Sequence, residues 1–395
     1  MNANGPMAGR QIRSAVIGVG FIGALHVDGL RRLGVDVVGV LASSPEETQA
    51  RADEWHIARA YTDLAELCAD PRVDVVHVAS PNHLHHDHVM ELLAAGKHVV
   101  CEKPLALTVA EGQAMDALAR ERGLVAALCF NVRFYPLLHQ MRAMVAAGDI
   151  GKPRLVTGGY QQDWLLLDTD WNWRLVPEQA GRLRAVADIG SHLLDAAQFV
   201  VGSPITSILA DLHTFVPVRR RPRGPVQTFA DTSADTDRVE IEMTSDDAAT
   251  ILLRFANGAA GSVVVSQVSP GRKNTLRLDI VGSRAGLEWS SENPEQLWIG
   301  HRERANELLA RDPSLLAQAA VGVSHYPGGH GEGFAETFLG FFGKVYEAVE
   351  TGVMPDPAPF ATFSDGIAGL RLEEAILRSN KRGTWAGVEG SSPHE

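Results

Sequence analysis

Ser14-Ala15-Val16-Ile17-Gly18-Val19-Gly20-Phe21-Ile22-Gly23 is the stretch that decides the fold of the first part of this 395-residue chain. The apolar residues before the glycines predict a strand that turns directly into a helix. Gly18 then makes the tight turn, Gly20 lets the backbone approach a pyrophosphate, and Gly23 lets the helix pack closely on the sheet. Since amides at a helix N-terminus attract anions, Gly18, Gly20, Phe21 and Ile22 are predicted to bind a dinucleotide.

Alternating strands and helices continue from this turn to about residue 133. Such alternation is typical of right-handed βαβ units, which wind a parallel sheet with helices on both faces. We therefore predict an α/β, doubly wound Rossmann domain over 11–133, after a disordered N-terminus over 1–10. The expected strands are 12–17, 35–41, 73–79, 98–101 and 125–130, and the expected helices are 23–33, 45–54, 83–95 and 108–122.

A different pattern follows Pro136 and predicts a second, α+β domain over 134–385 that binds substrate and mediates oligomerisation. Asn257-Gly258 supplies the positive φ of a tight turn between two apolar runs, which indicates a hairpin. The domain should contain an open, mainly antiparallel sheet, and 386–395 should be a flexible tail. The expected elements are helices over 136–147 and 189–201 and hairpins joining 250–255 to 261–268 and 276–281 to 287–289.

Composition excludes several classes of partner. The net charge of −12 argues against nucleic acid and anionic membranes, because phosphate binding depends on clustered Lys and Arg. No segment has the roughly 18–20 apolar residues of a membrane span. Cys68, Cys101 and Cys129 are widely spaced without a CxxC pair, so neither a disulfide framework nor a zinc site is predicted and a cytoplasmic location is expected. A neutral small molecule is the expected partner.

Two clusters resemble ligand sites by residue count alone. Pro217–Asp237 is predicted to be an exposed loop, and its arginines between 219 and 223 should be solvated rather than bind an anion. The four histidines point in different directions on one helical turn and lack nearby Cys or acidic partners, so no metal site is predicted and only His85 is read as functional. These histidines are His83, His85, His86 and His88.

The end of the second strand bears on the choice of cofactor. An Asp or Glu there would accept the 2′-hydroxyl of NAD, but this chain has Ala42-Ser43-Ser44. These three residues are expected to face the adenosine ribose. Without a carboxylate the site does not repel a 2′-phosphate, although no Arg follows immediately and the nearest is Arg51. NAD and NADP both remain open, with NADP slightly favoured.

Three spaced motifs suggest a family. Ser80-Pro81-Asn82-His83-Leu84-His85 and Glu102-Lys103-Pro104 follow the third and fourth strands, and Asp188-Ile189-Gly190-Ser191-His192-Leu193-Leu194-Asp195 lies in the second domain. With the glycine turn they resemble the Gfo/Idh/MocA oxidoreductases, the family of glucose-fructose oxidoreductase and inositol dehydrogenase. The last segment matches that family's DxGxHxxD pattern.

The resemblance implies roles for these residues. Pro81, Asn82 and His85 would line the nicotinamide half of the cofactor, Glu102 would bind near its ribose, and the remaining cofactor contacts would be Ser80, Lys103 and Asn131. Lys103, Asp188 and His192 would form the catalytic group and also bind substrate.

The chemistry of these side chains agrees with those roles. Oxidation of a carbinol requires a base to remove the hydroxyl proton while the cofactor takes the hydride. His192 has an ordinary pKa near 6.5, so it suits proton transfer at neutral pH. Lys103 favours a developing alkoxide, and Asp188 either orients a substrate hydroxyl or tunes His192. Whether Lys103 or His192 is the formal base stays open.

The chain departs from the family at one place and adds two features of its own. Arg182-Leu183-Arg184 replaces a glycine run, and these arginines either reach substrate or cofactor oxygens or face solvent. Trp164, Trp173 and Arg174 either bind a sugar ring, whose faces are apolar and whose edge is polar, or fill a core or subunit contact. The glycine-rich segment with Tyr326 and His330 either closes over substrate through one of them or is an ordinary helix entry.

Together these observations predict an NAD- or NADP-dependent dehydrogenase or reductase that acts on a secondary hydroxyl of a sugar, glycoside or cyclitol. The cofactor is expected between the two domains. Burial of the apolar outer face of the sheet predicts a homodimer or homotetramer. One alternative is an enzyme that cleaves glycosides by transient oxidation and elimination with bound NAD. Another is a non-catalytic dinucleotide-binding regulator, which would have no need of Lys103 and His192.

Overall fold

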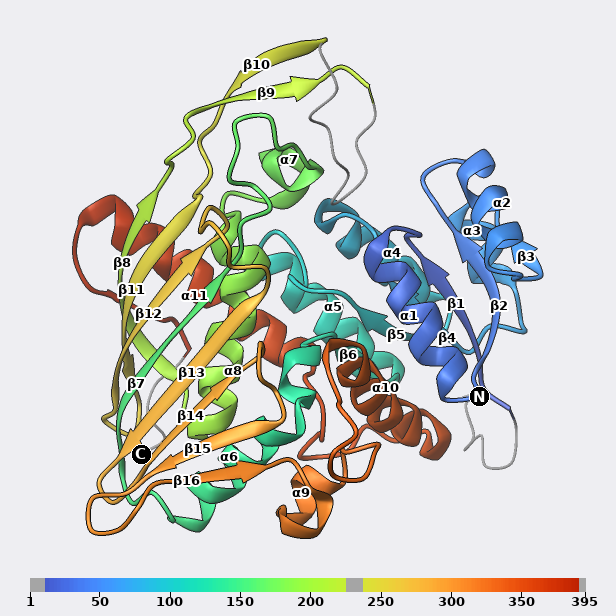
Figure 1. Ribbon diagram of the computed structural model, residues 1–395. Coiled ribbons are helices and arrows are strands. Elements are labelled where there is room, and N and C mark those ends of the chain that lie inside the picture. The colour runs from blue at the N-terminus through green and yellow to red at the C-terminus, as the bar shows by residue number, and fades with distance from the viewer. Residues whose placement is uncertain (1–10, 225–236, 391–395) are drawn as a thin grey trace. The chain divides into compact units, whose positions relative to one another are not determined.

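The computed structural model describes residues 11–224 and 237–390, which form two compact units (Figure 1). The first unit contains the chain up to Asn131 together with Ala335–Leu370, and the second contains Val132–Phe334 and the chain from Arg371. The predicted division into two contiguous domains therefore misses that Ala335–Leu370 returns to the first unit. The rings of Phe338 and Phe342 explain this return, because they pack against His26 in the first unit.

The first unit is built on a six-stranded parallel sheet with the order β3-β2-β1-β4-β5-β6. This is the order of a doubly wound dinucleotide-binding sheet, so the predicted Rossmann topology is confirmed. The two-residue β3 is too short to give a periodic signal and was not expected. The strands are β1 (Arg13–Ile17), β2 (Asp36–Leu41), β3 (Arg59–Ala60), β4 (Val75–Val78), β5 (His98–Cys101) and β6 (Ala126–Leu128).

The helices of this unit begin at recognisable caps. Ser44, Asp63 and Thr108 each accept a hydrogen bond from a backbone amide three residues later, and Thr108 forms a full capping box with Glu111. The short α3 was not predicted. The helices are α1 (Phe21–Arg32), α2 (Pro45–Glu54), α3 (Leu64–Ala69), α4 (His85–Ala94), α5 (Val109–Arg122), α10 (Phe334–Thr351) and the first part of α11 (Phe363–Arg382).

The second unit is built on a nine-stranded sheet with the order β16-β15-β14-β13-β7-β12-β11-β8-β17. Only β7 and β12 pair in parallel, so the predicted open and mainly antiparallel sheet is confirmed. The strands are β7 (Pro153–Gln161), β8 (Ile205–His213), β11 (Ala248–Phe255), β12 (Ala260–Ser266), β13 (Thr275–Gly282), β14 (Gly286–Ser290), β15 (Gln296–Gly300), β16 (Glu307–Ala310) and β17 (Ala386–Gly387).

Two predictions about the ends of the chain have different outcomes. The flexible tail expected from residue 386 is wrong up to 390, because β17 pairs with Ile208 and Ser207 of β8. The expected disordered segment 1–10 and the last residues, 391–395, lie outside the described residues.

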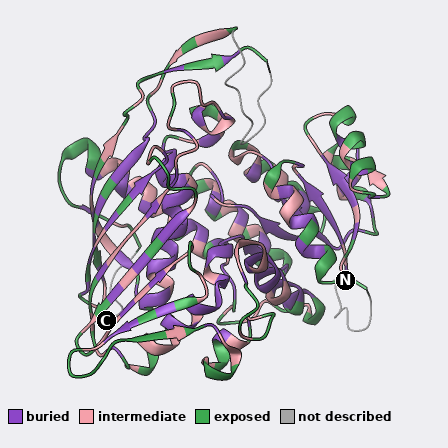
Figure 2. Cartoon of the chain, viewed as in Figure 1, coloured by how far each residue is buried: buried purple, intermediate pink, exposed green. Residues whose placement is uncertain are grey.

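Buried and exposed residues alternate along strands of the nine-stranded sheet, as along β11 (Figure 2). Ile251, Val263 and Leu278 belong to the buried face, which packs with α6 (Pro136–Ala147) and α8 (Ser191–Val201). The alternation of side chains along each strand puts the intervening residues on the opposite face. That face exposes six large apolar side chains, Leu155, Leu252, Val264, Val281, Trp298 and Leu308.

The segment from Pro217 to Asp237 is exposed at most of its described positions, as predicted, but its assignment as a loop is wrong. Val218–Pro222 forms β9, which pairs with β10 (Arg238–Glu242). The Arg219 side chain is fully buried and donates to the carbonyl oxygens of Leu165 and Leu167. Backbone carbonyls and the Asp247 carboxylate thus bind both terminal nitrogens of a guanidinium that was expected to be solvated. Residues 225–236 lie outside the described part of the chain.

Candidate functional site

The glycine turn after β1 has the geometry that a dinucleotide requires. A Cβ on Gly18, whose φ is +90°, would lie 2.3 Å from the Ala79 carbonyl oxygen, and a Cβ on Gly23 would lie 1.9 Å from the Gly18 carbonyl oxygen. A Cβ on Gly20 would meet nothing within 4 Å. The turn is therefore tightly packed on its inner side and open at Gly20, where α1 begins next to the exposed Phe21.

The serines at the end of β2 serve the local structure of α2. Ser44 caps the helix by accepting from the Glu47 amide (3.2 Å), and the exposed Ser43 hydroxyl donates to the Glu47 carboxylate (2.6 Å). Glu47 thus brings a carboxylate to the position where the sequence pattern lacked one. Repulsion between this carboxylate and a 2′-phosphate weakens the case for NADP.

His85 lies between the two motif turns of the first unit. Its ring is fully buried, with Nδ1 2.8 Å from the Pro104 carbonyl oxygen and Nε2 2.9 Å from the Ser80 carbonyl oxygen. Both nitrogens therefore face backbone oxygens, so this residue fixes the Ser80-Pro81-Asn82 turn relative to the cis Lys103-Pro104 bond. Its predicted contact with cofactor stays a prediction. A contact between a ring nitrogen of His85 and the cofactor would require that nitrogen to leave its carbonyl oxygen.

Glu102 is buried at the end of β5 and is ionised. Its Oε1 lies 3.0 Å from His26 Nε2, and its Oε2 accepts from the Lys103 amide at 3.2 Å. Burial by itself raises the pKa of Glu102, but the hydrogen bond and the electrostatic attraction of His26, together with the charge of Lys103, outweigh it and lower the pKa to about 2. The carboxylate therefore keeps its charge across the physiological range.

Asn131 follows β6 and is buried in the first unit. Its side-chain amide donates to the Thr337 hydroxyl of α10 at 2.8 Å, so the returning helix fixes the orientation of this amide. Its predicted contact with cofactor stays a prediction.

Asp188 is the centre of a polar cluster in the second unit. It lies in a π-helical turn, Val186–Gly190, that leads into α8. Its Oδ1 accepts from Arg174 Nε at 3.1 Å, and its Oδ2 accepts from Gln267 Nε2 at 2.7 Å. The Arg174 guanidinium lies 4.4 Å from the ring centroid of Trp173. The structure thus brings Trp173, Arg174 and Asp188 together, as a shared substrate site requires.

Gln162 extends the cluster to Trp164. The Trp164 indole donates to Gln162 Oε1 at 2.8 Å, and Gln267 Nε2 lies 3.5 Å from the same oxygen. Both glutamines are buried, although neither belongs to a motif. Sequence reasoning missed them, because their only signal is that each lies just beyond the end of a strand, β7 or β12.

His192 lies one turn after Asp188 on the same helical segment. Its ring is largely buried, and its centroid is 6.5 Å from that of Tyr160, whose hydroxyl donates to Asn274. Asp188 and His192 therefore belong to the second unit, whereas Lys103 belongs to the first.

Arg184 has neither of the roles that the sequence left open. It is almost fully buried, and its Nη1 donates to Gln267 Oε1 at 2.9 Å while its Nη2 pairs with Asp247. Arg219 pairs with the same carboxylate at 2.8 Å. Arg184 therefore holds the glutamine that binds Asp188, while Arg182 is exposed. The glycine run of the family is replaced here by a buried charge network.

Asp195, the last acid of the motif, has a structural role. Arg133 donates to both of its oxygens, at 2.7 Å and 2.5 Å. This pair ties the start of the second unit to α8. It fixes the helix that carries His192.

His330 remains in its own loop and is exposed. Its ring lies 3.3 Å from the Gly328 carbonyl oxygen, and its backbone oxygen accepts from Arg311. Arg311 is fully buried and also pairs with Glu295 and Glu332, so the loop is strongly anchored. The predicted substrate contacts of Tyr326 and His330 stay predictions.

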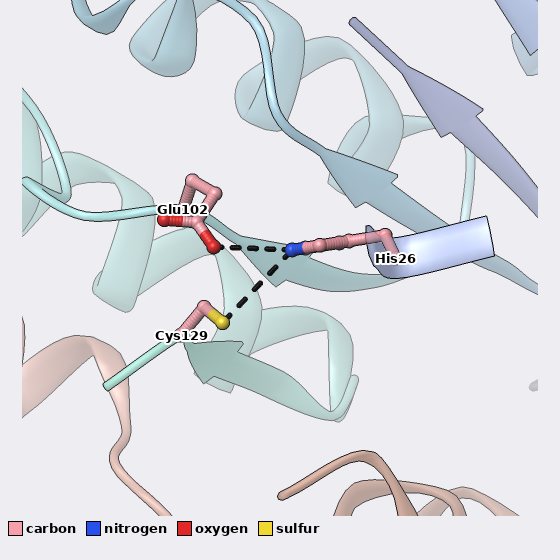
Figure 3. A group of neighbouring side chains, drawn as sticks. All are labelled: His26, Glu102 and Cys129. Carbon is pink, nitrogen blue, oxygen red and sulfur yellow. Dashed lines mark hydrogen bonds and ion pairs between the residues drawn. The ribbon is translucent and has the colours of Figure 1, made fainter. Parts of the chain in front are cut away.

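A single group of potential metal ligands occurs among residues 11–224 and 237–390. It consists of His26, Glu102 and Cys129, whose ligand atoms lie within 4.8 Å of one another (Figure 3). None of the helices in the same residues has the length and apolar character of a membrane crossing.

Comparison with known proteins agrees with this geometry. Residues 12–130 match the model of the oxidoreductase family with an NAD-binding Rossmann fold, and residues 138–288 match the GFO/IDH/MocA C-terminal domain. The chain belongs to the Gfo/Idh/MocA oxidoreductase family. This Gfo/Idh/MocA protein is 27% identical to levoglucosan dehydrogenase of Pseudarthrobacter phenanthrenivorans over 391 residues, which cover 96% of this chain and 98% of the relative.

Solved structures of related proteins extend the match. A levoglucosan dehydrogenase complex with NADH and levoglucosan superposes with a TM-score of 0.84 and 26% identity, over 95% of this chain and 99% of that one. An inositol dehydrogenase homologue from Azotobacter vinelandii with NAD+ superposes with a TM-score of 0.84 and 25% identity. The match covers 98% of this chain and 100% of that one. The predicted family, fold class and NAD(P)-dependent oxidoreductase class are thereby confirmed.

The buried network predicts that Arg184→Ala destabilises the protein strongly. The substitution removes one partner of Asp247 and the donor to Gln267, so we expect a loss of about 3 kcal/mol in the free energy of unfolding. Urea unfolding followed by circular dichroism measures this loss. Arg182→Ala is the matched control, because it removes an exposed arginine two residues away. Equal stability of the two variants would contradict the network.

Proposed function

We propose that this protein is an NAD-dependent dehydrogenase that oxidises a secondary hydroxyl of a cyclic sugar, glycoside or cyclitol. The observation that carries the proposal is the cluster around Asp188. It combines a carboxylate, a guanidinium, a buried amide and two indoles, all in a family whose first domain binds NAD.

The side chains of this cluster suit a ring with several hydroxyls. An indole face packs against the apolar C–H face of a sugar, while charged and amide groups bind the hydroxyls at its edge. Relatives that act on levoglucosan and on inositol support this substrate class, because both compounds are rings that carry secondary hydroxyls.

Three residues divide the work of the oxidation. NAD supplies the hydride acceptor when it is bound. His192 accepts the hydroxyl proton, Asp188 orients the hydroxyl or the imidazole, and Lys103 stabilises the negative charge that develops on oxygen. Arg174 and Gln267 keep Asp188 oriented, since each donates to one of its oxygens.

The function is tested by mixing the purified protein with NAD and with NADP against anhydrosugars, glycosides, polyols and inositols. Reduced nicotinamide is recorded by its absorbance, and we expect a signal with a cyclic substrate. Release of an aglycone without net cofactor reduction would instead show glycoside cleavage by oxidation and elimination. Dinucleotide binding without turnover of any compound would favour a regulator.

Lys103→Ala and His192→Ala should each lower kcat by about 100-fold or more, because each removes a group that acts in the transition state. Cofactor affinity should change much less in the His192 variant. Steady-state kinetics with the best substrate measures both effects. Lys381→Ala, which removes an exposed lysine near the end of α11, is the control. Unchanged turnover by either active-site variant would refute the assignment.

We further propose that the cofactor is NAD rather than NADP. The Glu47 carboxylate, in the first turn of α2, accepts a hydrogen bond from the Ser43 hydroxyl and would repel a 2′-phosphate. The NADH and NAD+ complexes of structural relatives support this choice.

Glu47→Ala should therefore raise the affinity for NADP+ relative to NAD+ by about fivefold to tenfold, which corresponds to about 1 kcal/mol for an exposed charge pair. Calorimetric titration with each dinucleotide measures the ratio. Asp53→Ala removes an exposed carboxylate from the other end of α2 and should leave the ratio unchanged. A wild-type protein that binds NADP+ more tightly would overturn the proposal.

The exposed face of the nine-stranded sheet supports a homo-oligomer. Its apolar side chains form a patch that a second copy would bury, and a closed symmetric assembly is the usual solution. The three free cysteines agree with a reducing, cytoplasmic location, which we also propose.

Val264→Asp places a charge at the centre of this face and should shift the protein toward monomer. Light scattering after size-exclusion chromatography measures the molar mass. Leu315→Asp is the control, since Leu315 is also an exposed apolar residue but lies outside the sheet. A wild-type monomer, or an unaffected oligomer in Val264→Asp, would contradict the proposed interface.

A further inference from the structure

A chain of hydrogen-bonded side chains runs through the interior of the first unit and ends at Glu102. The Ser14 hydroxyl contacts the Tyr346 hydroxyl, which lies 3.1 Å from His77 Nε2. His77 Nδ1 lies 3.0 Å from His26 Nδ1, and His26 Nε2 lies 3.0 Å from Glu102 Oε1 (Figure 3). Four side chains from β1, α10, β4 and α1 thus connect in a single line to Glu102, which follows β5.

All five residues are buried, and aromatic rings surround the middle of the chain. The ring of Phe342 lies 4.9 Å from that of His26 and 4.7 Å from that of His77. Since water has little access to such a site, each polar atom must find its partner within the chain. The arrangement of hydrogens is therefore restricted.

The partners determine which nitrogens carry hydrogen. Ionised Glu102 only accepts, so His26 Nε2 must donate to it. A neutral His26 then accepts at Nδ1, which requires the hydrogen of His77 to be on Nδ1. His77 Nε2 consequently accepts from the Tyr346 hydroxyl. Burial raises the pKa of Tyr346 and lowers the pKa of His77 well below its ordinary value, so both are in the neutral forms that this order needs.

The opposite order leaves a hydrogen unmatched. If His26 were a cation, His77 would donate to Tyr346 and Tyr346 to Ser14, and the Ser14 hydroxyl would need a further acceptor. Tyr346 is the one hydrogen-bond partner of that hydroxyl in the part of the chain that the structure describes. An unmatched buried donor costs free energy and so opposes the cationic order, although the charge of Glu102 favours it; the proposed order is the one in which every donor is matched.

Glu102 passes this orientation on to the next residue. Its second oxygen accepts from the backbone amide of Lys103, so the carboxylate joins His26 on one side to the Lys103 backbone on the other. Movement of the carboxylate would therefore shift the residue that the proposed function places at the reacting oxygen.

We propose that His26, held in one tautomer by His77 and Tyr346, is a positioning residue that orients Glu102 and through it Lys103. The role of Lys103 in this inference rests on the proposed function. The orientation of Glu102 by the hydrogen bonds does not depend on that function. His77 and Tyr346 contribute to cofactor binding and turnover although each contacts Glu102 only through His26.

The same atoms are close enough for a metal ion, but their hydrogens oppose it. His26 Nε2 directs a hydrogen, not a lone pair, toward Glu102. Burial and the charge of Glu102 raise the pKa of the Cys129 thiol well above its ordinary value, so its sulfur, 4.0 Å from His26 Nε2, stays protonated. Hydrogen bonding accounts for the cluster without a metal.

Nitrogen NMR of the ¹⁵N-histidine-labelled full chain tests the tautomers directly, because protonated and unprotonated ring nitrogens have distinct shifts. We expect neutral His26 with hydrogen on Nε2 and neutral His77 with hydrogen on Nδ1. His26→Gln and His77→Asn assign the signals. An Nε2–H tautomer of His77, or a cationic His26, would overturn the proposal.

A double-mutant cycle tests the coupling. His77→Phe should weaken NAD+ binding about fivefold and lower kcat, because His26 becomes free to turn its lone pair toward Glu102. His77→Asn, whose amide donates in place of Nδ1–H, should restore most of the loss. In a Glu102→Gln background His77→Phe should have little further effect, and full additivity would overturn the proposal.

The control is His98, a buried histidine on the neighbouring β5 whose Nδ1 accepts from the Val125 amide. His98→Phe should lower thermal stability but add its effect independently to that of Glu102→Gln. If His98 were coupled to Glu102 as strongly as His77 is, the proposed line of hydrogen bonds would not be specific and the proposal would be contradicted.

Two further measurements separate the possible failures. Dinucleotide titration needs no sugar, so the cycle can be read even if no substrate is oxidised and the proposed function fails. Elemental analysis of the purified protein should find no stoichiometric metal. If the protein contained one equivalent of zinc, and the Cys129→Ser variant lost it, the hydrogen-bonded chain would be overturned in favour of a metal site.

Discussion

A carboxylate that is largely shielded from water must have its oxygens hydrogen-bonded, and this requirement shapes both units of the protein. Glu102 receives one donor from a helix of the Rossmann domain and another from the backbone of the next residue. Asp188 receives a guanidinium on one oxygen and a buried amide on the other. Each carboxylate has one donor that is distant in sequence, His26 for Glu102 and Gln267 for Asp188, so the fold must be complete before either carboxylate is oriented.

The donors are themselves held in place, which gives each site a second layer of contacts. Gln267 binds Asp188 correctly only if its oxygen faces Arg184, and His26 binds Glu102 correctly only if its other nitrogen faces His77. An amide and an imidazole both have a donor side and an acceptor side, so a partner on one side determines what the other side presents. Orientation is thus transmitted over several residues without any movement of the backbone.

The sequence predicted the parts of the fold that depend on local pattern. The glycine turn and the alternation of strands and helices are local signals, and the hairpin at Asn257-Gly258 is another, so these were placed correctly. The return of Ala335–Leu370 to the first unit was not, because it depends on Phe338 and Phe342 packing on a distant helix. Very short elements such as β3 also gave no periodic signal.

Residues with several possible partners were the hardest to interpret. Arg184 and Arg219 were expected to meet ligand or solvent, since arginine is usually exposed. Both are buried because Asp247 lies between them, a pairing across more than 60 residues for Arg184 that no local pattern reveals. The motif residues Asp188 and Glu102 were identified from sequence, but the side chains that orient them were not.

The residues after β2 show why a residue type alone does not determine a ligand. Two serines after a Rossmann strand favoured a 2′-phosphate, because free hydroxyls donate to phosphate oxygens. In the folded chain Ser44 is an acceptor for the helix backbone, and Ser43 gives its hydrogen to Glu47. Once α2 forms, the pair presents a carboxylate rather than two donors. Both hydroxyls are therefore engaged within the chain and are not the free phosphate donors that the sequence suggested.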